Sequence, residues 1–350
     1  MSPVGIAERP PELELPFAQH PAPGCALQVA PGVFWVRMPL PLALNHINLW
    51  LLEQADGWTV VDCGFNSDET RTLWERVFAA CLGGRPIRRL IVTHFHPDHL
   101  GLCAWLTRRW DVEVWMTEAE YLTAHAVFDS AAGHGKDELF ALFRRHGLAE
   151  SRIAEMADFG NSYRRWMQEL PGRFRRILPD EAIDIGANVW RVVVGHGHAP
   201  EHAALYCDAL GVMISGDMVL PRITTNVSVR AAEPDGNPLK LFLDSLLRYR
   251  ALPGEALVLP SHGMVFRGLH SRIDQLLAHH ADRLDALKRA LTEPATAAAV
   301  APVLFPRELD ARQWFFAMGE AIAHLNYLML DGGVERETGA DGLYRFRSTA

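Results

Sequence analysis

The sequence predicts a layered α/β protein that ends in a helical C-terminal region. Three observations lead to this prediction. Short apolar runs typical of strands alternate with helical patterns through most of the chain. Several of the strands end in loops that carry histidine and aspartate. Residues 276–350 instead show a series of helical patterns followed by a hairpin.

Composition limits the classes of function. A chain of 350 residues, 49% of them hydrophobic, can bury the core of one large domain with an appendage. The net charge of −8 provides no general attraction for nucleic acid or an anionic membrane. The five cysteines are scattered without a Cys-x-x-Cys pair, as expected of free thiols in a reducing compartment. Because we find neither a signal peptide nor a long apolar span, we expect a cytoplasmic protein.

The first half of the chain predicts an arm and then alternating elements. Residues 1–25, rich in proline and glutamate, are expected to form an extended N-terminal arm. Antiparallel strands should follow at 33–36, 47–52 and 58–62. A helix is expected at 67–82, because a capping residue and acidic residues mark its first turn. Strand, helix and strand then follow at 88–93, 100–110 and 112–116.

Residues 118–178 interrupt this alternation. The stretch is helix-prone, rich in aromatic residues, and contains the basic pairs Arg144-Arg145, Arg164-Arg165 and Arg175-Arg176. We predict a helical insertion, whose aromatic residues either pack among its own helices or form a lid over an apolar pocket. Strands should resume at 182–185, 190–194, 203–207, 211–215 and 257–259.

The C-terminal region, residues 276–350, is predicted to be a domain of its own. Helical patterns at 271–291, 294–304 and 311–330 precede a hairpin, which is the element order of a winged helix. Acidic residues outnumber basic ones here, which disfavours nucleic-acid binding. The last helix is largely apolar, so we expect it to pack on the body or on a second subunit, and a homodimer is one of these two alternatives.

The most informative stretch follows the 88–93 strand and reads THFHPDHLG. It places His94, His96, Asp98 and His99 within six positions. In an extended segment His94 and His96 project to the same side, close enough to bind one ion. Asp98 and His99 follow a proline and could serve a second ion nearby. A bound metal is the usual reason for such a cluster.

Three later loops carry similar residues, each directly after an apolar strand. His198 and His202 lie in GHGHAPEH, Asp217 lies in SGD, and His262 lies in PSHG. Loops at the ends of strands are where α/β enzymes carry their site residues. The sequence therefore predicts that these side chains join the first cluster.

These motifs in this order resemble the metallo-β-lactamase superfamily over roughly residues 30–270. The resemblance implies an αββα sandwich of two mixed sheets with helices outside, and a dinuclear metal site along one edge. It assigns 26–275 to the catalytic domain. It also implies a role for each residue: His94, His96 and His198 bind the first metal, Asp98, His99 and His262 bind the second, Asp217 bridges both, and Asp62 orients a ligating imidazole.

The implied function is a metal-dependent hydrolase that uses a metal-bridged hydroxide on a small ester, thioester, lactone or amide. Two divalent ions are expected, with zinc favoured and iron or manganese as alternatives. Asp98 could relay a proton to the leaving group, and His202 could hydrogen-bond the oxyanion. The partner is expected to be a small-molecule substrate.

Other functions remain open on the sequence. The His198–His202 loop, the insertion and the tail together resemble a group of β-lactamase-like hydrolases, some of which act on RNA. An endoribonuclease or phosphodiesterase is therefore one alternative, and the arginine pairs favour it. A mononuclear-iron sulfur dioxygenase is another, although seven candidate ligands exceed the need of one metal. The last alternative is a non-catalytic binding module that a metal stabilises.

Three further histidines could belong to the site or lie elsewhere. His196 could be mistaken for the ligand at 198. His134 could reach the site from the insertion. His46 could line the mouth of the site, although an ordinary surface or core position is favoured for it.

Overall fold

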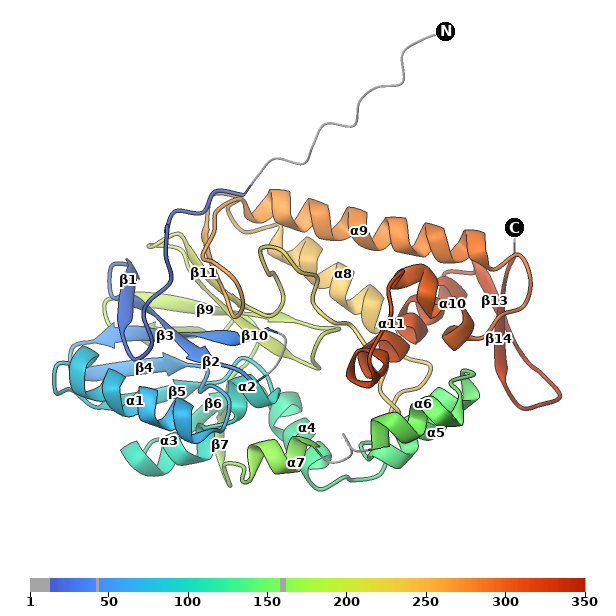
Figure 1. Cartoon of the computed structure of the whole chain (residues 1–350). Helices are drawn as coiled ribbons and strands as arrows, with labels where there is room; N and C mark the ends of the chain where they lie inside the picture. The colour runs from blue at the N-terminus through green and yellow to red at the C-terminus, as the bar shows by residue number, and fades with distance from the viewer. Residues whose placement is uncertain (1–12, 42–43, 158–161, 350) are drawn as a thin grey trace, which may run out of the picture.

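A computed structural model describes residues 13–41, 44–157 and 162–349. Two β-sheets lie face to face, with helices on both outer faces, as Figure 1 shows. The predicted αββα sandwich is confirmed. Of the predicted N-terminal arm, residues 1–12 lie outside the described part, and residues 13–25 run along the body, where Glu14 forms a bridge with Arg267.

The first sheet has seven strands in sequential order and is mixed, because β1 to β4 pair antiparallel and β4 to β7 pair parallel. Its strands are β1 (Ala26–Ala30), β2 (Val33–Pro39), β3 (His46–Gln54), β4 (Gly57–Val61), β5 (Ile87–Ile91), β6 (Val114–Met116) and β7 (Phe174–Arg176).

The second sheet has five strands in the order β12-β11-β10-β9-β8. It is also mixed, since β8 to β11 pair antiparallel while β11 and β12 run parallel. Its strands are β8 (Ala182–Ile185), β9 (Asn188–Gly195), β10 (His202–Cys207), β11 (Val212–Gly216) and β12 (Leu257–Pro260). The loops that follow β5 in the first sheet and β9, β11 and β12 in the second meet at one edge of the sandwich, where site residues can gather.

Three hydrophobic cores hold these layers together. One fills the space between the sheets, with Trp35, Trp50 and Trp190 fully buried in it. A second lies between the first sheet and two outer helices, α1 (Asp68–Cys81) and α3 (Cys103–Trp110). The third covers the outer face of the second sheet with α8 (Pro238–Tyr249) and α9 (Leu269–Ala290). The helix α2 (Pro97–Leu100) lies at the edge that carries the metal-ligand motif.

The insertion is largely helical, as predicted, but its end is not. It contains α4 (Glu118–Phe128), α5 (Lys136–Arg145), α6 (Glu150–Met156) and α7 (Ser162–Met167), and it then adds β7 to the first sheet. Its residues 158–161 lie outside the described part. The strand was missed because it is short and carries Arg175 and Arg176 in place of apolar alternation. Neither β1 nor α8 was predicted from the sequence, although Asn237 and the following proline form a typical start for α8.

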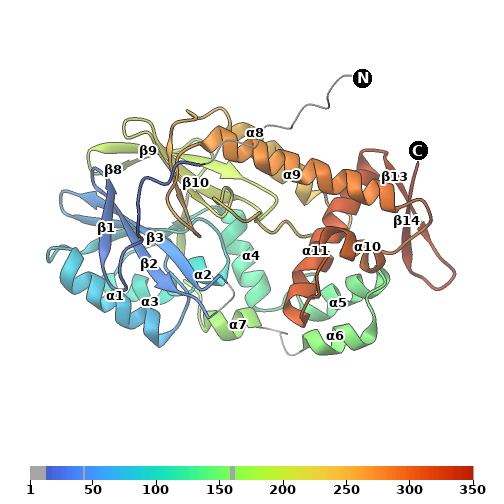
Figure 2. The ribbon, with the colours of Figure 1, turned by 45° about the horizontal axis from the view of Figure 1, so that its top comes forward.

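The tail follows the predicted order of three helices and a hairpin. After α9 come α10 (Ala297–Leu304), α11 (Ala311–Leu330), and the paired strands β13 (Val334–Thr338) and β14 (Tyr344–Ser348). Figure 2 shows α10 and α11 beside the insertion helices α5 and α6, and α11 contacts α6, α8 and α9. The winged-helix assignment itself stays a prediction.

The apolar face of α11 packs on the body of the same chain. Met318, Ile322 and Leu325 are fully buried and join the third core, together with residues of the second sheet. Of the two alternatives expected for this helix, packing on the body or on a second subunit, the structure supports packing on the body. A homodimer through this face is not supported.

Two further observations concern the whole described chain. All five cysteines lie within it, and none is paired in a disulfide. Among the described residues, we find no helix with the length and apolar character needed to cross a membrane.

Candidate metal centre

The candidate ligands lie at the ends of four strands, as their motifs predicted. His94 and His96 follow β5, and Asp98 and His99 lie in the short helix α2. The other three come from the second sheet. His198 lies between β9 and β10, Asp217 follows β11, and His262 follows β12.

The structure brings all seven side chains together in two groups. His94, His96, His198 and Asp217 form the first, and Asp98, His99 and His262 form the second. In each group one ligand atom per residue lies within 4.8 Å of every other. Imidazole nitrogens and carboxylate oxygens are donors that suit zinc and other divalent transition metals. The seven side chains therefore fit a dinuclear site.

Asp217 lies between the two groups and turns one oxygen to each. Its Oδ2 is 3.4 Å from His198 Nε2 and 3.9 Å from His94 Nε2. Its Oδ1 is 3.5 Å from His99 Nε2 and 3.4 Å from His262 Nε2. This division of its two oxygens is the arrangement that a bridging carboxylate requires.

Two buried atoms at the centre indicate where a metal would fit. Asp217 Oδ1 and His99 Nε2 are both buried without a hydrogen-bond partner among the described residues. Leaving such polar atoms unpaired costs about 1–3 kcal/mol each. A divalent ion between them would satisfy both, so the donor set fits the group that the motifs imply.

Neighbouring hydrogen-bond acceptors fix which nitrogen three of the imidazoles can offer to a metal. Asp62 Oδ2 accepts the Nδ1–H of His99 at 2.8 Å. The carbonyl oxygen of Asn226 lies 2.8 Å from His198 Nδ1, and that of His46 lies 2.8 Å from His262 Nδ1. Because a carbonyl or carboxylate can only accept, each ring is protonated at Nδ1 and leaves its Nε2 lone pair free for a metal. Asp62 thus lies where its predicted orienting role requires it.

Asp62 also binds Thr93, the residue directly before His94. Its Oδ1 accepts the backbone N–H of Thr93 at 2.8 Å, and the Thr93 hydroxyl donates to the same carboxylate. Asp62 adopts φ of 64°, in the left-handed region that non-glycine residues rarely occupy. Such strain persists where the surroundings demand it, and here three hydrogen-bond donors to one buried carboxylate do so.

Burial and neighbouring charges move the ionisation of the ligands in opposite directions. Burial, with help from the adjacent histidines, lowers the pKa of His94 well below its usual range, so this ring stays neutral and able to bind a metal. Burial also opposes charge on His99, but the carboxylates of Asp62, Asp98 and Asp217 outweigh it and raise the His99 pKa. A proton therefore competes with a metal for His99 Nε2, so metal binding should weaken in acid.

His202 lies behind the centre and is fully buried. Its Nε2 accepts the backbone N–H of Asp217 at 3.2 Å, and its ring lies beside that of His94 with centroids 4.9 Å apart. A Cβ at Gly216 would lie 2.2 Å from His202 Nε2, so only glycine fits there. This placement favours a role in positioning Asp217 over the predicted contact with a substrate oxyanion.

The three other histidines considered in the sequence lie in three different places. His196 Nδ1 lies 2.6 Å from the Pro200 carbonyl, and this ring is in neither ligand group. His134 lines a small cavity of about 130 Å³ between the insertion and α11. His46 lies at the mouth of the site, the position that the sequence did not favour, because its Nε2 accepts the N–H of Gly263 next to His262.

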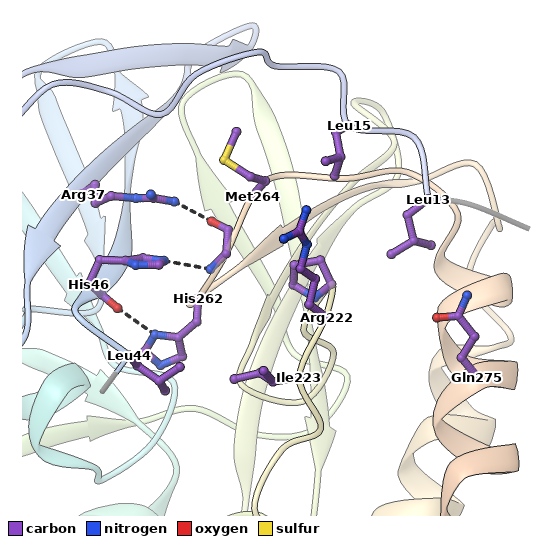
Figure 3. Close-up of a pocket in the computed structure, with 12 residues that line it drawn as sticks. Leu13, Leu15, Arg37, Leu44, His46, Arg222, Ile223, His262, Met264 and Gln275 are labelled. Atoms are coloured by element: carbon purple, nitrogen blue, oxygen red, sulfur yellow. Dashed lines mark hydrogen bonds between the residues drawn. The ribbon is translucent and has the colours of Figure 1, made fainter. Parts of the chain in front are cut away.

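A pocket of about 740 Å³ opens beside His262 (Figure 3). Its walls come from the N-terminal arm, the start of β3, the segment after β11 and the loop after β12. Leu15, Leu44 and Ile223 line it and remain 43%, 39% and 43% exposed. Arg222 also lines the pocket and is exposed to solvent. The centre thus adjoins an apolar pocket whose lining also carries an accessible cation.

The chain belongs to the metallo-β-lactamase superfamily. The model of that superfamily matches residues 43–262, which include every candidate ligand. A second model, the metallo-beta-lactamase-like C-terminal domain, matches residues 284–349. Together with the site, these matches define the chain as a metallo-hydrolase of this superfamily.

Particular relatives cover almost the whole chain. A beta-lactamase domain protein from Burkholderia ambifaria is 48% identical, with a TM-score of 0.90 over 96% of this chain and 98% of its own. A metallo-beta-lactamase family protein from Thermus thermophilus is 30% identical, with a TM-score of 0.78 over 92% and 100%. The probable metallo-hydrolase YqjP of Bacillus subtilis is 26% identical over 85% of this chain and 92% of its own.

Proposed function

We propose that this chain is a dinuclear metal hydrolase acting on small substrates that combine an apolar chain with an anionic group. The hydrolysed bond is that of an ester, thioester, lactone or amide. The observation that carries the dinuclear assignment is the position of Asp217, with one oxygen toward each group of histidines. In this assignment His94, His96 and His198 bind the first ion, and Asp98, His99 and His262 bind the second.

The chemistry of such a site comes from the ions and from the side chains that hold them. Two divalent ions bound here would lower the pKa of water toward neutral and stabilise negative charge on a substrate oxygen. Zinc is the proposed ion, and iron and manganese suit the same donors. Asp98 Oδ2 lies 3.4 Å from His262 Nε2, where this carboxylate can also pass a proton to the leaving group.

The pocket beside His262 supports the substrate class. Its apolar side chains would bury a hydrocarbon chain, and each methylene group buried is worth about 0.8 kcal/mol. Arg222 would bind a carboxylate or phosphate on the same molecule, because a guanidinium matches these groups with paired hydrogen bonds. A substrate lying along the pocket would have its scissile bond near His262.

The experiment that tests the proposed function is a hydrolysis screen on protein of known metal content. The panel pairs chromogenic esters, thioesters, lactones and amides, with and without an anionic group, and adds phosphodiesters and RNA. We expect turnover of apolar acyl substrates, strongest for those with the anionic group. Turnover of RNA or phosphodiesters alone would contradict the proposal.

We expect Arg222→Gln to raise KM for the anionic members of this panel by about 10-fold or more, since a hydrogen bond to a charged group contributes about 1.5–3 kcal/mol. The turnover number should change little, because Arg222 lies away from the bond that breaks. The neutral substrate with the same acyl chain serves as the control. Equal effects on the charged and neutral substrates would rule out an ion pair with Arg222.

The predicted roles of Asp98 and His202 can be separated by two variants. Asp98→Asn should lower kcat if the carboxylate moves a proton, and retention of both metals with full activity would exclude that role. His202→Ala should weaken metal binding by about 10- to 100-fold, since His202 supports the backbone of Asp217. Metal content and kcat, measured on both variants and on exposed His20→Ala, check these expectations.

The alternative functions receive less support. Arg144, Arg164, Arg175 and Arg176, which favoured RNA, form ion pairs with Glu150, Asp129, Glu181 and Glu118. These pairs reduce the positive field available to phosphates. A complete second ligand group, with Asp98, His99 and His262, disfavours a one-metal dioxygenase.

A further inference from the structure

The peptide between the two histidines of the first motif is held by the insertion. Glu120 Oε2 accepts the backbone N–H of Phe95 at 2.9 Å. The hydroxyl of Tyr163 donates to the carbonyl oxygen of the same residue at 2.7 Å. Phe95 separates His94 from His96, so both of its backbone polar groups are bound by side chains of the 118–178 insertion, one from α4 and one from α7.

The same carboxylate reaches the second metal-binding loop. Glu120 Oε1 accepts the backbone N–H of Glu201 at 2.7 Å. Glu201 lies three residues after His198 and directly before His202. The start of α4 binds this residue at two more points, because the Thr117 hydroxyl donates to the Glu201 carbonyl and the Ala119 N–H donates to its carboxylate. A single side chain therefore connects the loops that contribute three ligands of the first metal.

We propose that Glu120, aided by Tyr163, is a positioning residue of the metal centre that fixes the spacing between the His94–His96 and His198 loops. This proposal rests on the proposed metal centre. A role in packing alone does not explain the residue type, because Glu120 is fully buried and a buried carboxylate costs free energy unless it is well bonded. Burial raises the pKa of Glu120 to about 7. The two backbone N–H groups act against this rise, because their hydrogen bonds stabilise the carboxylate form.

The chemistry of the contact requires a carboxylate. Both partners of Glu120 are backbone N–H donors, and a carboxylate offers two oxygens that only accept. Glutamine has nearly the same shape, but it must turn its amino group toward one of these donors. Glu120→Gln therefore breaks one link while it preserves the volume and most of the packing.

The chain offers a matched control two residues away. Glu118 lies in the same first turn of α4, but its side chain is 45% exposed and pairs with Arg176 at the surface. Glu118→Gln makes the same chemical change without touching either loop. Tyr163→Phe removes only the second hydrogen bond to Phe95 and leaves the ring in place.

The test measures zinc affinity by competition with a chromophoric chelator, together with melting of the metal-free and metal-loaded proteins. We expect Glu120→Gln to weaken zinc binding by about 10- to 100-fold and Tyr163→Phe by about 2- to 10-fold. The rise in Tm on metal binding should shrink in both variants. Glu118→Gln should match the wild type.

Each outcome has a distinct meaning. Wild-type affinity in both Glu120→Gln and Tyr163→Phe overturns the proposal, as does an equal loss of Tm with and without metal. If Glu120→Gln does not fold, Tyr163→Phe decides. If the wild-type protein itself binds no metal, the proposed metal centre fails, and that result is separate from the role of Glu120.

Discussion

Replacing Asp217 with asparagine is expected to abolish hydrolysis and to reduce the metal content from two ions per chain to one or fewer. Asparagine retains the shape of the side chain but can direct only one oxygen to a metal, whereas Asp217 directs one to each group. Metal ions contribute several kcal/mol to stabilising charge in the transition state, so kcat should fall by about 1000-fold or more.

Metal analysis and steady-state kinetics on the same samples check this result. Asp208→Asn provides a control, because Asp208 is exposed at the far end of β10, where its side chain accepts a hydrogen bond from Tyr206 and lies away from the metal centre. An Asp217→Asn protein that binds two metals and turns over at the wild-type rate would refute the bridging assignment.

A chain that ends at Glu293 is expected not to fold into an active protein. It lacks α10, α11 and the hairpin, and so removes Met318, Ile322, Leu325 and Phe346 from a core shared with the second sheet. Each fully buried side chain of this kind contributes about 1.5–3 kcal/mol. A whole domain is stable by only about 5–15 kcal/mol, so this loss should exceed the margin.

The truncation also removes a support of the metal centre. The carbonyl of Asn226 binds His198 Nδ1, and the Val229 N–H of the same segment donates to the Gly319 carbonyl on α11 at 3.2 Å. A Cβ at Gly319 would lie 2.6 Å from Ser228 Oγ, so helix and segment are in close contact. Soluble yield, circular dichroism and metal content test the expectation. A soluble, cooperatively melting fragment that binds two metals would show that the catalytic domain is independent of the tail.

The metal centre could be predicted from the sequence because its residues carry their own signal. His94, His96, Asp98 and His99 lie within six positions, and His198 and His262 each follow a strand that the apolar pattern identifies. Side chains at strand ends meet when the strands share an edge. The αββα layers could also be predicted, because the strand pattern and the resemblance to the metallo-β-lactamase superfamily indicate the same arrangement.

The supports of the centre could not be predicted in this way. Glu120 binds backbone N–H groups that lie 25 and 81 residues away in the sequence, and any residue type can provide such a group. Asn226 acts through its backbone carbonyl, a group that every residue type has, so the residue type at this position gives no signal. His46 was underrated because its contact with Gly263 depends on how the loop after β12 meets β3, a long-range packing that no local pattern encodes.

The measurement that tests the central claim most directly is a zinc titration of the metal-free protein, followed by calorimetry and by hydrolysis of the best substrate of the screen. We predict that each chain binds two equivalents and that activity reaches its maximum only when the second is bound. Saturation at one equivalent with full activity, or undiminished hydrolysis by the metal-free protein, would contradict a dinuclear hydrolase built on Asp217.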